Sequence, residues 1–313
     1  MQQPRFVTGW LVVVALLCIG LLMVTYVLSV HTYRGRLLDG ASLRGAADSP
    51  TSVSDVIERL LDVVSVSSLL VAAALVVMIA LLRLRRDLAV AATVVIVGAN
   101  ATTQVLKRWV LSRPDLGIDE TTPATLNSLP SGHSTVAFSV ALALVLVLPT
   151  RLRPAAAVFG VVYAAVAAVA TLSAGWHRPS DSLAAFFVVG AWAAAAQAVV
   201  LRRSASVGPV GEPAGAGHIP TARRLAVAAA YLLAFGAVVA GVVVATQLDS
   251  YGTAAQVLAL VAAAGAIGGT AAALMAALVA VRADVVDRVD KEPPRARGVP
   301  PRIAAALREN EGA

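Results

Sequence analysis

Two long stretches without a charged side chain most constrain what this chain can fold into. They cover residues 10–30 and 225–248 and consist mainly of Leu, Val and Ala. An α-helix rises about 1.5 Å per residue, so about 20 apolar residues cross the roughly 30 Å of hydrocarbon in a bilayer. Further apolar runs lie between these two stretches. The sequence therefore predicts a polytopic helical membrane protein.

Composition excludes the other broad classes of fold. Of the 313 residues, 58% are hydrophobic and 14% are charged, whereas about 25% of residues are charged in ordinary soluble domains. Aromatic residues make up 5% of the chain. Ten-residue segments of alternating polarity, which mark outer-membrane barrels, do not occur in the sequence. The expected fold class is all-α.

The apolar runs predict about eight transmembrane helices, at residues 10–30, 63–82, 88–106, 134–149, 155–173, 183–201, 225–247 and 254–281. The first run is longer than the apolar region of a signal peptide and no cleavage pattern follows it, so we interpret it as an uncleaved span. It contains Cys18, the single cysteine, which excludes a disulfide within the chain and a Cys-based metal site. We interpret Cys18 as a lipid-facing or packing residue.

The spans group into four regions. Residues 1–203 are expected to form a six-span transmembrane core, and residues 204–224, rich in Gly, Pro, Ala and Ser, a flexible cytoplasmic linker. Residues 225–281 form a two-span appendage and residues 282–313 a cytoplasmic tail. Gly265 and Gly269 form a GxxxG pair in the appendage, for which packing within the chain is favoured over dimerisation. Formation of a homo-oligomer stays an open alternative.

The basic residues predict the orientation. If the spans alternate, 17 of the 25 Lys and Arg residues fall on the side of the two termini. The positive-inside rule then places both termini in the cytoplasm. This topology also accounts for the net charge of +7, and because no soluble basic domain is present we expect no nucleic-acid partner. In the outward segment 31–62, Ser52 and Asp55 resemble a capping box and predict an interfacial helix.

Three outward segments carry residues suited to chemistry. The first follows the third span and holds Lys107, one of only 2 lysines, and Arg113. Either residue can bind an anion or serve only as an interfacial anchor. Asp115, Asp119 and Glu120 in the same loop are interpreted as a solvated acidic stretch and not as a metal site.

The second segment, residues 130–133, reads Pro-Ser-Gly-His and enters the fourth span directly. Ser131 can cap that helix, and Gly132 lets an anion approach the backbone closely. The free amides and the helix dipole together make a phosphate site. A plain turn before a helix, with His133 as an interfacial residue, is the alternative interpretation.

The third segment places His177 at the outer end of the fifth span and Asp181 four residues later, at the start of the sixth. A hydrogen bond between them would fix one ring nitrogen and leave the other as a nucleophile. Alternatively, Asp181 is only a favourable charge at a helix N-terminus.

Taken together, these segments resemble the signature of the type-2 phosphatidic acid phosphatase superfamily, membrane lipid phosphatases with a vanadium haloperoxidase-like site. The resemblance covers roughly residues 55–203; the Pro-Ser-Gly-His motif is complete, as is the His-to-Asp half of the third motif. Two departures occur. Five residues instead of six separate Lys107 from Arg113, and Ala170 and Thr171 occupy the positions of the expected Ser-Arg pair.

The resemblance implies a six-helix phosphatase-like core with a metal-independent mechanism and no cofactor. His177 would attack phosphorus to give a phosphohistidine, Asp181 would orient it, and His133 would act as acid and then base. The remaining expected residues hold the phosphate oxygens: Lys107, Arg113, Ser131, Gly132 and, as a replacement for the missing arginine, Arg178. No metal ligand is implied.

The expected function is hydrolysis of a lipid phosphate or diphosphate at the outer face of the plasma membrane. Phosphatidate and a polyprenyl diphosphate both fit a site where membrane lipids present their headgroups. Two alternatives stay open: a lipid phosphotransferase, and a non-catalytic transporter or headgroup-binding scaffold, which Thr171 favours. Transport is disfavoured because the spans hold few polar residues beyond Asn100, Gln104 and Gln197.

Overall fold

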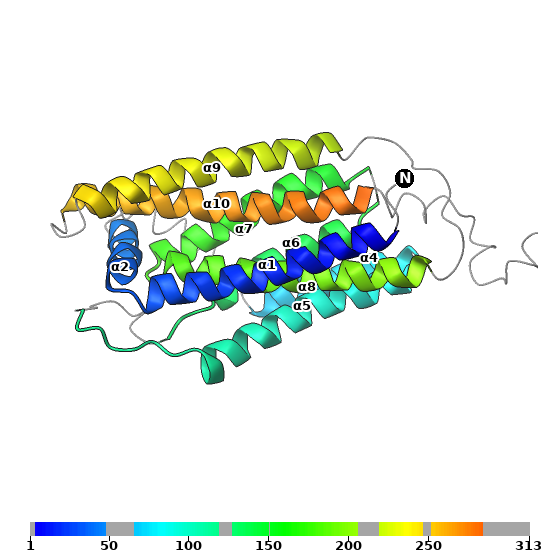
Figure 1. The fold of residues 1–313 in the computed structure, drawn as a ribbon. Helices are drawn as coiled ribbons and strands as arrows, with labels where there is room; N and C mark the ends of the chain where they lie inside the picture. The colour runs from blue at the N-terminus through cyan, green and yellow to red at the C-terminus, as the bar shows by residue number, and fades with distance from the viewer. Residues whose placement is uncertain are drawn as a thin grey trace, which may run out of the picture.

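The computed structural model describes residues 4–47, 66–118, 127–149, 151–205, 219–246 and 252–283. Within these ranges the regular structure is entirely helical, as the sequence predicts. The elements are α1 (Pro4–Val30), α2 (Tyr33–Ala47), α4 (Val66–Leu82), α5 (Arg86–Val105), the π-helical turn η1 (Leu106–Val110), α6 (Gly132–Val147), α7 (Arg153–Ser173), α8 (Pro179–Ala205), α9 (Ile219–Thr246) and α10 (Thr253–Ala283). The long helices form one bundle, and α2 lies across one end of it (Figure 1).

Six of these helical segments are long and apolar enough to cross a membrane: Val7–Val30, Arg86–Val110, Arg153–Ser173, Pro179–Arg203, Thr221–Val243 and Thr253–Ala280. They coincide with six of the eight predicted spans and agree with a polytopic membrane protein. The other two predicted spans correspond to shorter apolar helices, Val71–Leu82 and Gly132–Val147. The count of eight therefore stays a prediction.

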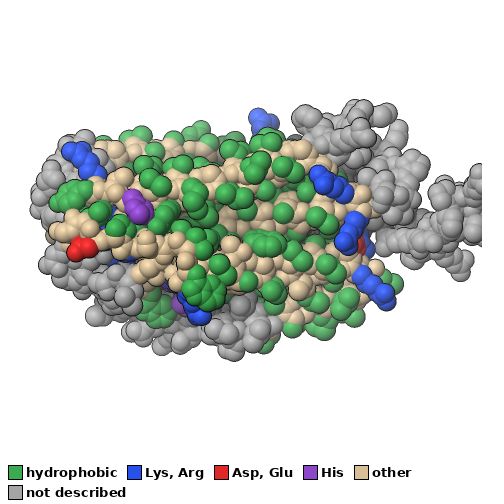
Figure 2. Space-filling model, turned by 60° about the horizontal axis from the view of Figure 1, so that its bottom comes forward, with side chains coloured by type: hydrophobic (Ala, Val, Ile, Leu, Met, Phe, Trp, Pro, Cys, Tyr) green, Lys and Arg blue, Asp and Glu red, His purple; other side chains and the backbone are tan. Residues whose placement is uncertain are grey.

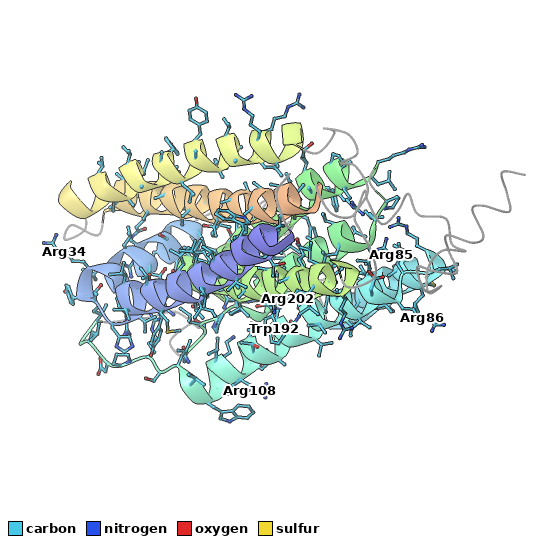
Figure 3. The ribbon with its side chains drawn as sticks, turned by 45° about the vertical axis from the view of Figure 1, so that its right-hand side comes forward. Arg34, Arg85, Arg86, Arg108, Trp192 and Arg202 are labelled. Atoms are coloured by element: carbon cyan, nitrogen blue, oxygen red, sulfur yellow. The ribbon has the colours of Figure 1, made fainter. Side chains whose placement is uncertain are left out.

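The molecular surface has the pattern expected of a membrane protein. Hydrophobic side chains are spread along the whole side of the bundle shown in Figure 2, and most of the basic side chains lie toward its ends. Arg85 and Arg86 lie at one end of the bundle and Arg34 at the other, with Trp192 between them (Figure 3). The charged groups thus avoid the middle of the apolar belt, where they are costly.

Small residues bring the helices close together. A Cβ atom on Gly98 would lie 2.8 Å from the ring of Trp192, so α5 and α8 meet at this glycine. A Cβ on Gly190 of α8 would lie 2.9 Å from the sulfur of Cys18 on α1. Cys18 is 1% exposed. Of the two interpretations of this cysteine, packing is confirmed.

The C-terminal helices α9 and α10 pack on each other through glycines. A Cβ on Gly265 would lie 3.0 Å from the carbonyl oxygen of Leu232, and one on Gly269 would lie 2.7 Å from Leu233. Packing of the GxxxG pair within the chain is therefore confirmed. Helix α9 begins at Ile219, inside the stretch predicted as linker, and residues 206–218 lie outside the described ranges.

Helix α2 is the element that the sequence did not predict. Thr32 begins it, because the Thr32 hydroxyl accepts a hydrogen bond from the amide of Gly35 at 3.1 Å, as an N-cap residue does. The interfacial helix predicted from Ser52 and Asp55 falls in residues 48–65, outside the described ranges. α2 instead turns the chain directly after α1.

Candidate active site

The predicted site residues gather at the end of the bundle that α2 crosses. They come from three places: the end of α5 with η1, the N-terminus of α6, and the turn from α7 to α8. The N-termini of α6 and α8 thus lie at the same end. Because each helix N-terminus carries partial positive charge and free amides, this arrangement favours an anion between them.

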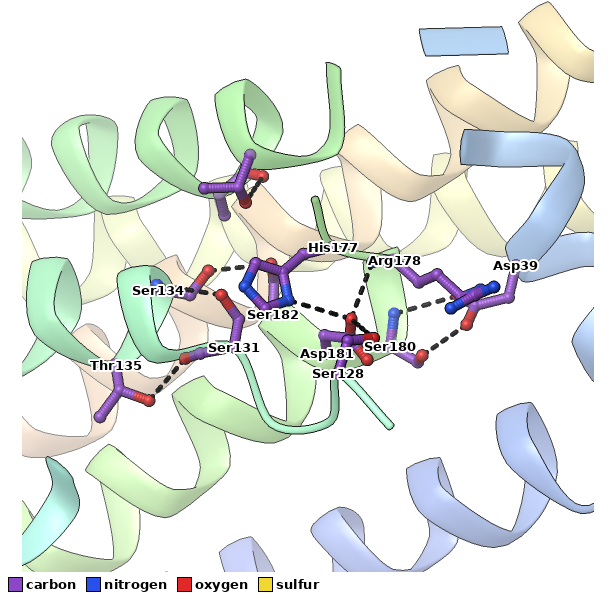
Figure 4. A network of polar contacts seen from close by, with 12 residues as sticks. Asp39, Ser128, Ser131, Ser134, Thr135, His177, Arg178, Ser180, Asp181 and Ser182 are labelled. Atoms are coloured by element: carbon purple, nitrogen blue, oxygen red, sulfur yellow. Dashed lines mark hydrogen bonds and ion pairs between the residues drawn. The ribbon is translucent and has the colours of Figure 1, made fainter. Parts of the chain in front are cut away.

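His177 and Asp181 form the predicted pair. Nδ1 of His177 lies 3.2 Å from Oδ2 of Asp181, and the two side chains are 8% and 0% exposed. This bond occupies Nδ1 of the imidazole, so Nε2 is the nitrogen left for chemistry. Figure 4 shows the pair within a network of polar contacts.

Asp181 also organises the backbone around it. Oδ2 accepts hydrogen bonds from the Ser128 hydroxyl at 2.6 Å and from the amide of Arg178 at 2.9 Å. The second contact is a capping interaction, since Asp181 lies in the first turn of α8 and reaches back to the residue before that helix. The Asp181 carbonyl accepts from the amide of Ser131 at 2.9 Å. One residue therefore joins the second and third predicted segments.

A tight turn between α7 and α8 presents His177. Gly175 has a φ of +73°, a left-handed conformation that favours glycine after a helix end. The amides of Trp176 and His177 then donate to the carbonyl of Thr171, at 3.1 and 3.3 Å. Thr171, which stands where the family signature has arginine, is fully buried and its hydroxyl bonds to the carbonyl of Ala168. Its backbone therefore shapes the turn.

The N-terminus of α6 has the geometry of an anion site. Ser131 is the N-cap, with its hydroxyl accepting from the amide of Ser134 at 3.3 Å, which confirms the predicted cap. Gly132 and His133 are the first two residues of the helix, so the hydrogen-bond pattern of the α-helix gives their amides no acceptor within the helix. A Cβ on Gly132 would meet only Gln104, at 3.7 Å. Packing does not require this glycine, whereas close approach of a ligand would.

His133 faces His177 across the site. Their ring centroids lie 5.8 Å apart, and the His133 ring lies 5.4 Å from that of Trp176. Nδ1 of His133 is buried and has no hydrogen-bond partner in the described part of the chain. A buried polar atom without a partner costs free energy, which is recovered when a ligand or water binds there.

Lys107 and Arg113 lie at the same end of the bundle. Lys107 is half-buried in η1, within electrostatic range of both Asp181 and His133. The Asn127 side-chain amide donates to the carbonyls of Lys107 at 3.0 Å and Leu111 at 2.6 Å, which closes the end of the helix. Arg113 follows in extended chain and is also half-buried.

Arg178 takes a different direction from the one expected. It is 2% exposed, and its side chain extends away from the His177 ring toward Asp39 of α2 (Figure 4). Its positive charge acts on the Asp39 carboxylate. This placement does not support the expectation that Arg178 supplies the missing phosphate-binding charge.

A layer of buried hydroxyl groups lies next to the site. The hydroxyls of Ser134 and Ser182 are 2.9 Å apart, and those of Thr103 and Thr135 are also 2.9 Å apart. These pairs join α6 to α8 and α5 to α6. Sequence reasoning missed this layer, as well as Ser128, Asn127 and Asp39, because isolated Ser, Thr and Asn residues carry no distinctive spacing. Within the described ranges, no three His, Cys, Asp or Glu side chains come together as around a metal ion.

The fold and the site define a helical membrane protein in which two histidines and an aspartate lie close to the N-termini of two helices. The family model of the PAP2 superfamily matches residues 88–205, which span α5 to α8. The match confirms the resemblance seen in the sequence and contains each of the eight site residues that the sequence predicted. No curated protein and no solved structure matches the chain.

Proposed function

We propose that the protein is a metal-independent lipid phosphatase that hydrolyses a phosphate or diphosphate monoester through a phosphohistidine. The observation that carries this proposal is the pairing of His177 with Asp181 opposite His133, with ring centroids 5.8 Å apart. This separation lets the two imidazoles act on opposite sides of one phosphoryl group. The PAP2 superfamily match over residues 88–205 supports a phosphatase-type reaction.

In the first step, Nε2 of His177 attacks phosphorus as the bond from phosphorus to the lipid oxygen breaks. His133, in its protonated form, gives its proton to the departing oxygen, so the lipid leaves as a neutral alcohol or as a monophosphate. Asp181 holds Nδ1–H and stabilises the positive charge that develops on the ring of His177. The phosphoryl group then resides on nitrogen.

In the second step, neutral His133 takes a proton from water as the water oxygen attacks phosphorus. The phosphorus–nitrogen bond breaks, inorganic phosphate leaves, and His177 returns to its starting state. Lys107, Arg113 and the α6 amides of Gly132 and His133 neutralise the phosphoryl oxygens, with Ser131 fixing the turn that presents those amides. Positioning and charge neutralisation are the main requirements of phosphoryl transfer.

Two exposed tryptophans support a lipid substrate. Trp109 in η1 is 76% exposed, and Trp176, whose ring adjoins His133, is 45% exposed. Tryptophan is enriched where the hydrocarbon meets the headgroups. A site at this level meets a phosphate headgroup while the acyl or prenyl chain stays in the bilayer. Phosphatidate and polyprenyl diphosphate both meet this requirement.

The site end of the bundle is proposed to face outward, at the plasma membrane. Four arginines lie at helix ends opposite those that carry the site. Arg86, Arg202 and Arg203 are exposed. Arg85 is buried and pairs with Asp87. A greater density of arginine marks the cytoplasmic side. Both termini would then be cytoplasmic, as the distribution of basic residues predicts.

The direct test is phosphate release from lipid phosphates and diphosphates by the full chain in detergent with EDTA. The variant is His177→Ala and its matched control is His31→Phe, which keeps the edge-on ring contact with Tyr26 and removes an imidazole outside the site. We expect phosphate release by the wild type and the control and none by His177→Ala. Of the wild type and His177→Ala, only the wild type should form an acid-labile phosphoenzyme.

Two other outcomes identify the alternatives. Transfer of phosphate to an added alcohol in preference to water would indicate a lipid phosphotransferase. Binding of the lipids without release would indicate a headgroup-binding protein, which Thr171 in the arginine position and the direction of Arg178 favour. Activity that requires a metal ion would overturn the proposed mechanism.

A further inference from the structure

Helix α2 buries two charged residues one turn apart at the end of the bundle. Arg36 is 5% exposed and Asp39 is 6% exposed. Charged side chains are rarely buried without partners, because desolvation costs several kcal/mol. Both residues lie outside the region that matches the PAP2 superfamily, and both reach segments inside it.

Arg36 holds the segment that carries Arg113. Nη1 of Arg36 donates to the carbonyl of Pro114 at 2.5 Å. On the other side of Arg113, the hydroxyl of Tyr26 donates to the carbonyl of Ser112 at 2.9 Å and accepts from its amide at 3.1 Å. The residues before and after Arg113 are therefore both anchored to the α1–α2 corner.

Asp39 holds the segment that carries His177 and Asp181. Its carboxylate accepts from the amide of Ser180 at 3.1 Å and from the Ser180 hydroxyl at 2.5 Å. Ser180 immediately precedes Asp181 in the first turn of α8. Burial raises the pKa of the Asp39 carboxyl to about 6, and the negative charge of Asp181 adds to this, whereas the Ser180 hydrogen bonds and the Arg178 charge oppose it.

The rest of α2 is seated on α10. The Ser42 hydroxyl donates to the carbonyl of Ala259 at 3.0 Å. Gly45 lies so close to α10 that a Cβ atom there would overlap the carbonyl of Gln256. Leu43 belongs to one buried cluster with residues of α7 and α10. Helix α10 thus supports the part of α2 that follows Asp39.

We propose that α2 is a clamp in which Arg36 and Asp39 are positioning residues, holding the Arg113 segment and the His177–Asp181 segment at a fixed separation. Helices α9 and α10, which the superfamily match does not include, provide the seat for this clamp. The proposal deepens the proposed function and rests on it for its kinetic predictions. The position of the His177–Asp181 segment can be tested without measuring turnover.

The kinetic test compares Asp39→Ala and Asp39→Asn with the control Asp115→Asn. Asp115 is exposed at the same end and accepts from the amide of Gly117 at 2.8 Å, a contact that Asn can keep. We expect Asp39→Ala to lower kcat by about 10- to 100-fold, since small misplacement of reacting groups costs that much. KM should change less, and Asp39→Asn should restore part of kcat because its amide oxygen still accepts from Ser180.

Arg36 provides the complementary variant. Arg36→Leu releases the Pro114 carbonyl and loosens the Arg113 segment, which is proposed to bind phosphate, so KM should rise more than kcat falls. A merely structural role would reduce the amount of folded protein for both variants without this split. Effects on kcat and KM in the same ratio for Asp39→Ala and Arg36→Leu would overturn the proposal.

A chemical readout separates this inference from the proposed function. Diethyl pyrocarbonate modifies accessible histidine nitrogens, and the rate at His177 can be followed by mass spectrometry of its peptide. We expect faster modification of His177 in Asp39→Ala than in the wild type or Asp115→Asn. If the wild type releases no phosphate, this rate still tests the clamp. If Asp39→Ala does not fold, Ser180→Ala removes the hydroxyl contact to Asp39 from the other side and keeps the contact from the amide.

Three results give clear decisions. An active wild type with unchanged kcat and unchanged His177 modification in Asp39→Ala would overturn the clamp and leave the phosphatase intact. An inactive wild type with faster modification in Asp39→Ala would overturn the phosphatase and support the clamp. An active wild type, reduced kcat and faster modification would support both.

Discussion

Oδ2 of Asp181 lies 3.2 Å from Nδ1 of His177 and also accepts the amide of Arg178 at 2.9 Å. The carboxylate thus fixes both the imidazole and the backbone that carries it. Because the contact to Nδ1 determines which ring nitrogen holds the proton, Asp181 controls whether Nε2 of His177 is available as a nucleophile.

Replacement of Asp181 by Asn tests this control. The amide side chain presents either NH₂ or oxygen at the position of Oδ2, which faces both Nδ1 and the Arg178 amide. NH₂ there loses the bond from the Arg178 amide and favours the wrong tautomer, whereas oxygen there lacks the full negative charge that stabilises the imidazolium. We expect kcat to fall by about 10²–10⁴-fold with a small change in KM. Phosphate release measured beside the Asp115→Asn control checks this, and a kcat within threefold of the control would contradict the role of Asp181.

His133 is expected to matter most for substrates with poor leaving groups. In His133→Gln, an alkyl phosphate should lose about 10²–10⁴-fold in rate, because its departing oxygen needs a proton. An aryl phosphate such as p-nitrophenyl phosphate leaves without one, so its first step should be nearly preserved. Water attack should then become limiting, and phosphohistidine should accumulate. Equal losses for both substrates, without a trapped intermediate, would remove His133 from this role.

The parts of the site that could be predicted from sequence are local in the chain. The His177–Asp181 pair and the Ser131 cap depend on spacings of four and three residues at helix starts, which helix geometry fixes. The contact of Asp39 with Ser180 joins residues 141 apart in sequence, so no sequence spacing predicts it. The role predicted for Arg178 is not supported by its position, because its amide donates to Asp181 while its side chain extends toward Asp39.

The helices of the fold likewise differ in how well the sequence predicts them. Long apolar runs predicted the candidate spans, because the bilayer sets a minimum length and excludes charge. The short helix α2 was missed, since it carries Arg36, Asp39 and Arg44 and has neither an apolar run nor a clear amphipathic face. Its only local signal is the cap at Thr32. Its position depends on α10, which lies more than 200 residues further along the chain.

Arg178 and Asp39 should depend on each other energetically. Arg178→Met leaves the buried Asp39 carboxylate next to Asp181 without the compensating charge, and we expect lower kcat and a lower unfolding midpoint. Adding Asp39→Asn should recover part of both losses, because the unpaired buried charge disappears. A double-mutant cycle on the unfolding midpoint should give a coupling of about 0.5–3 kcal/mol. Strict additivity would show that the two side chains act separately.

The buried Asp39 carboxyl should make stability depend on pH. Its pKa is raised to about 6 in the folded protein from the ordinary value of 3.8, so the folded state binds a proton that the unfolded chain releases. Between about pH 4 and pH 6, stability should therefore fall as pH rises, by an amount on the order of 3 kcal/mol from this group. Asp39→Asn should flatten the unfolding midpoint measured across that range. An unchanged slope would assign the dependence to other groups.

Two glycines of α2 give a matched test of its seat on α10. Alanine is favoured over glycine within helices by about 1 kcal/mol, and a Cβ on Gly40 would meet only the Arg44 side chain, at 3.6 Å. Gly40→Ala should therefore be neutral or stabilising. A Cβ on Gly45 would overlap the Gln256 carbonyl, so Gly45→Ala must move α2 away from α10.

If α2 positions the site as proposed, Gly45→Ala should lower both the unfolding midpoint and kcat, with faster modification of His177 by diethyl pyrocarbonate, whereas Gly40→Ala should change none of them adversely. The measurement is the unfolding midpoint in detergent together with phosphate release for the two variants. A lower midpoint with unchanged kcat in Gly45→Ala would mean that α10 stabilises α2 without any effect on the catalytic segments, because the displacement would then stop short of Asp39.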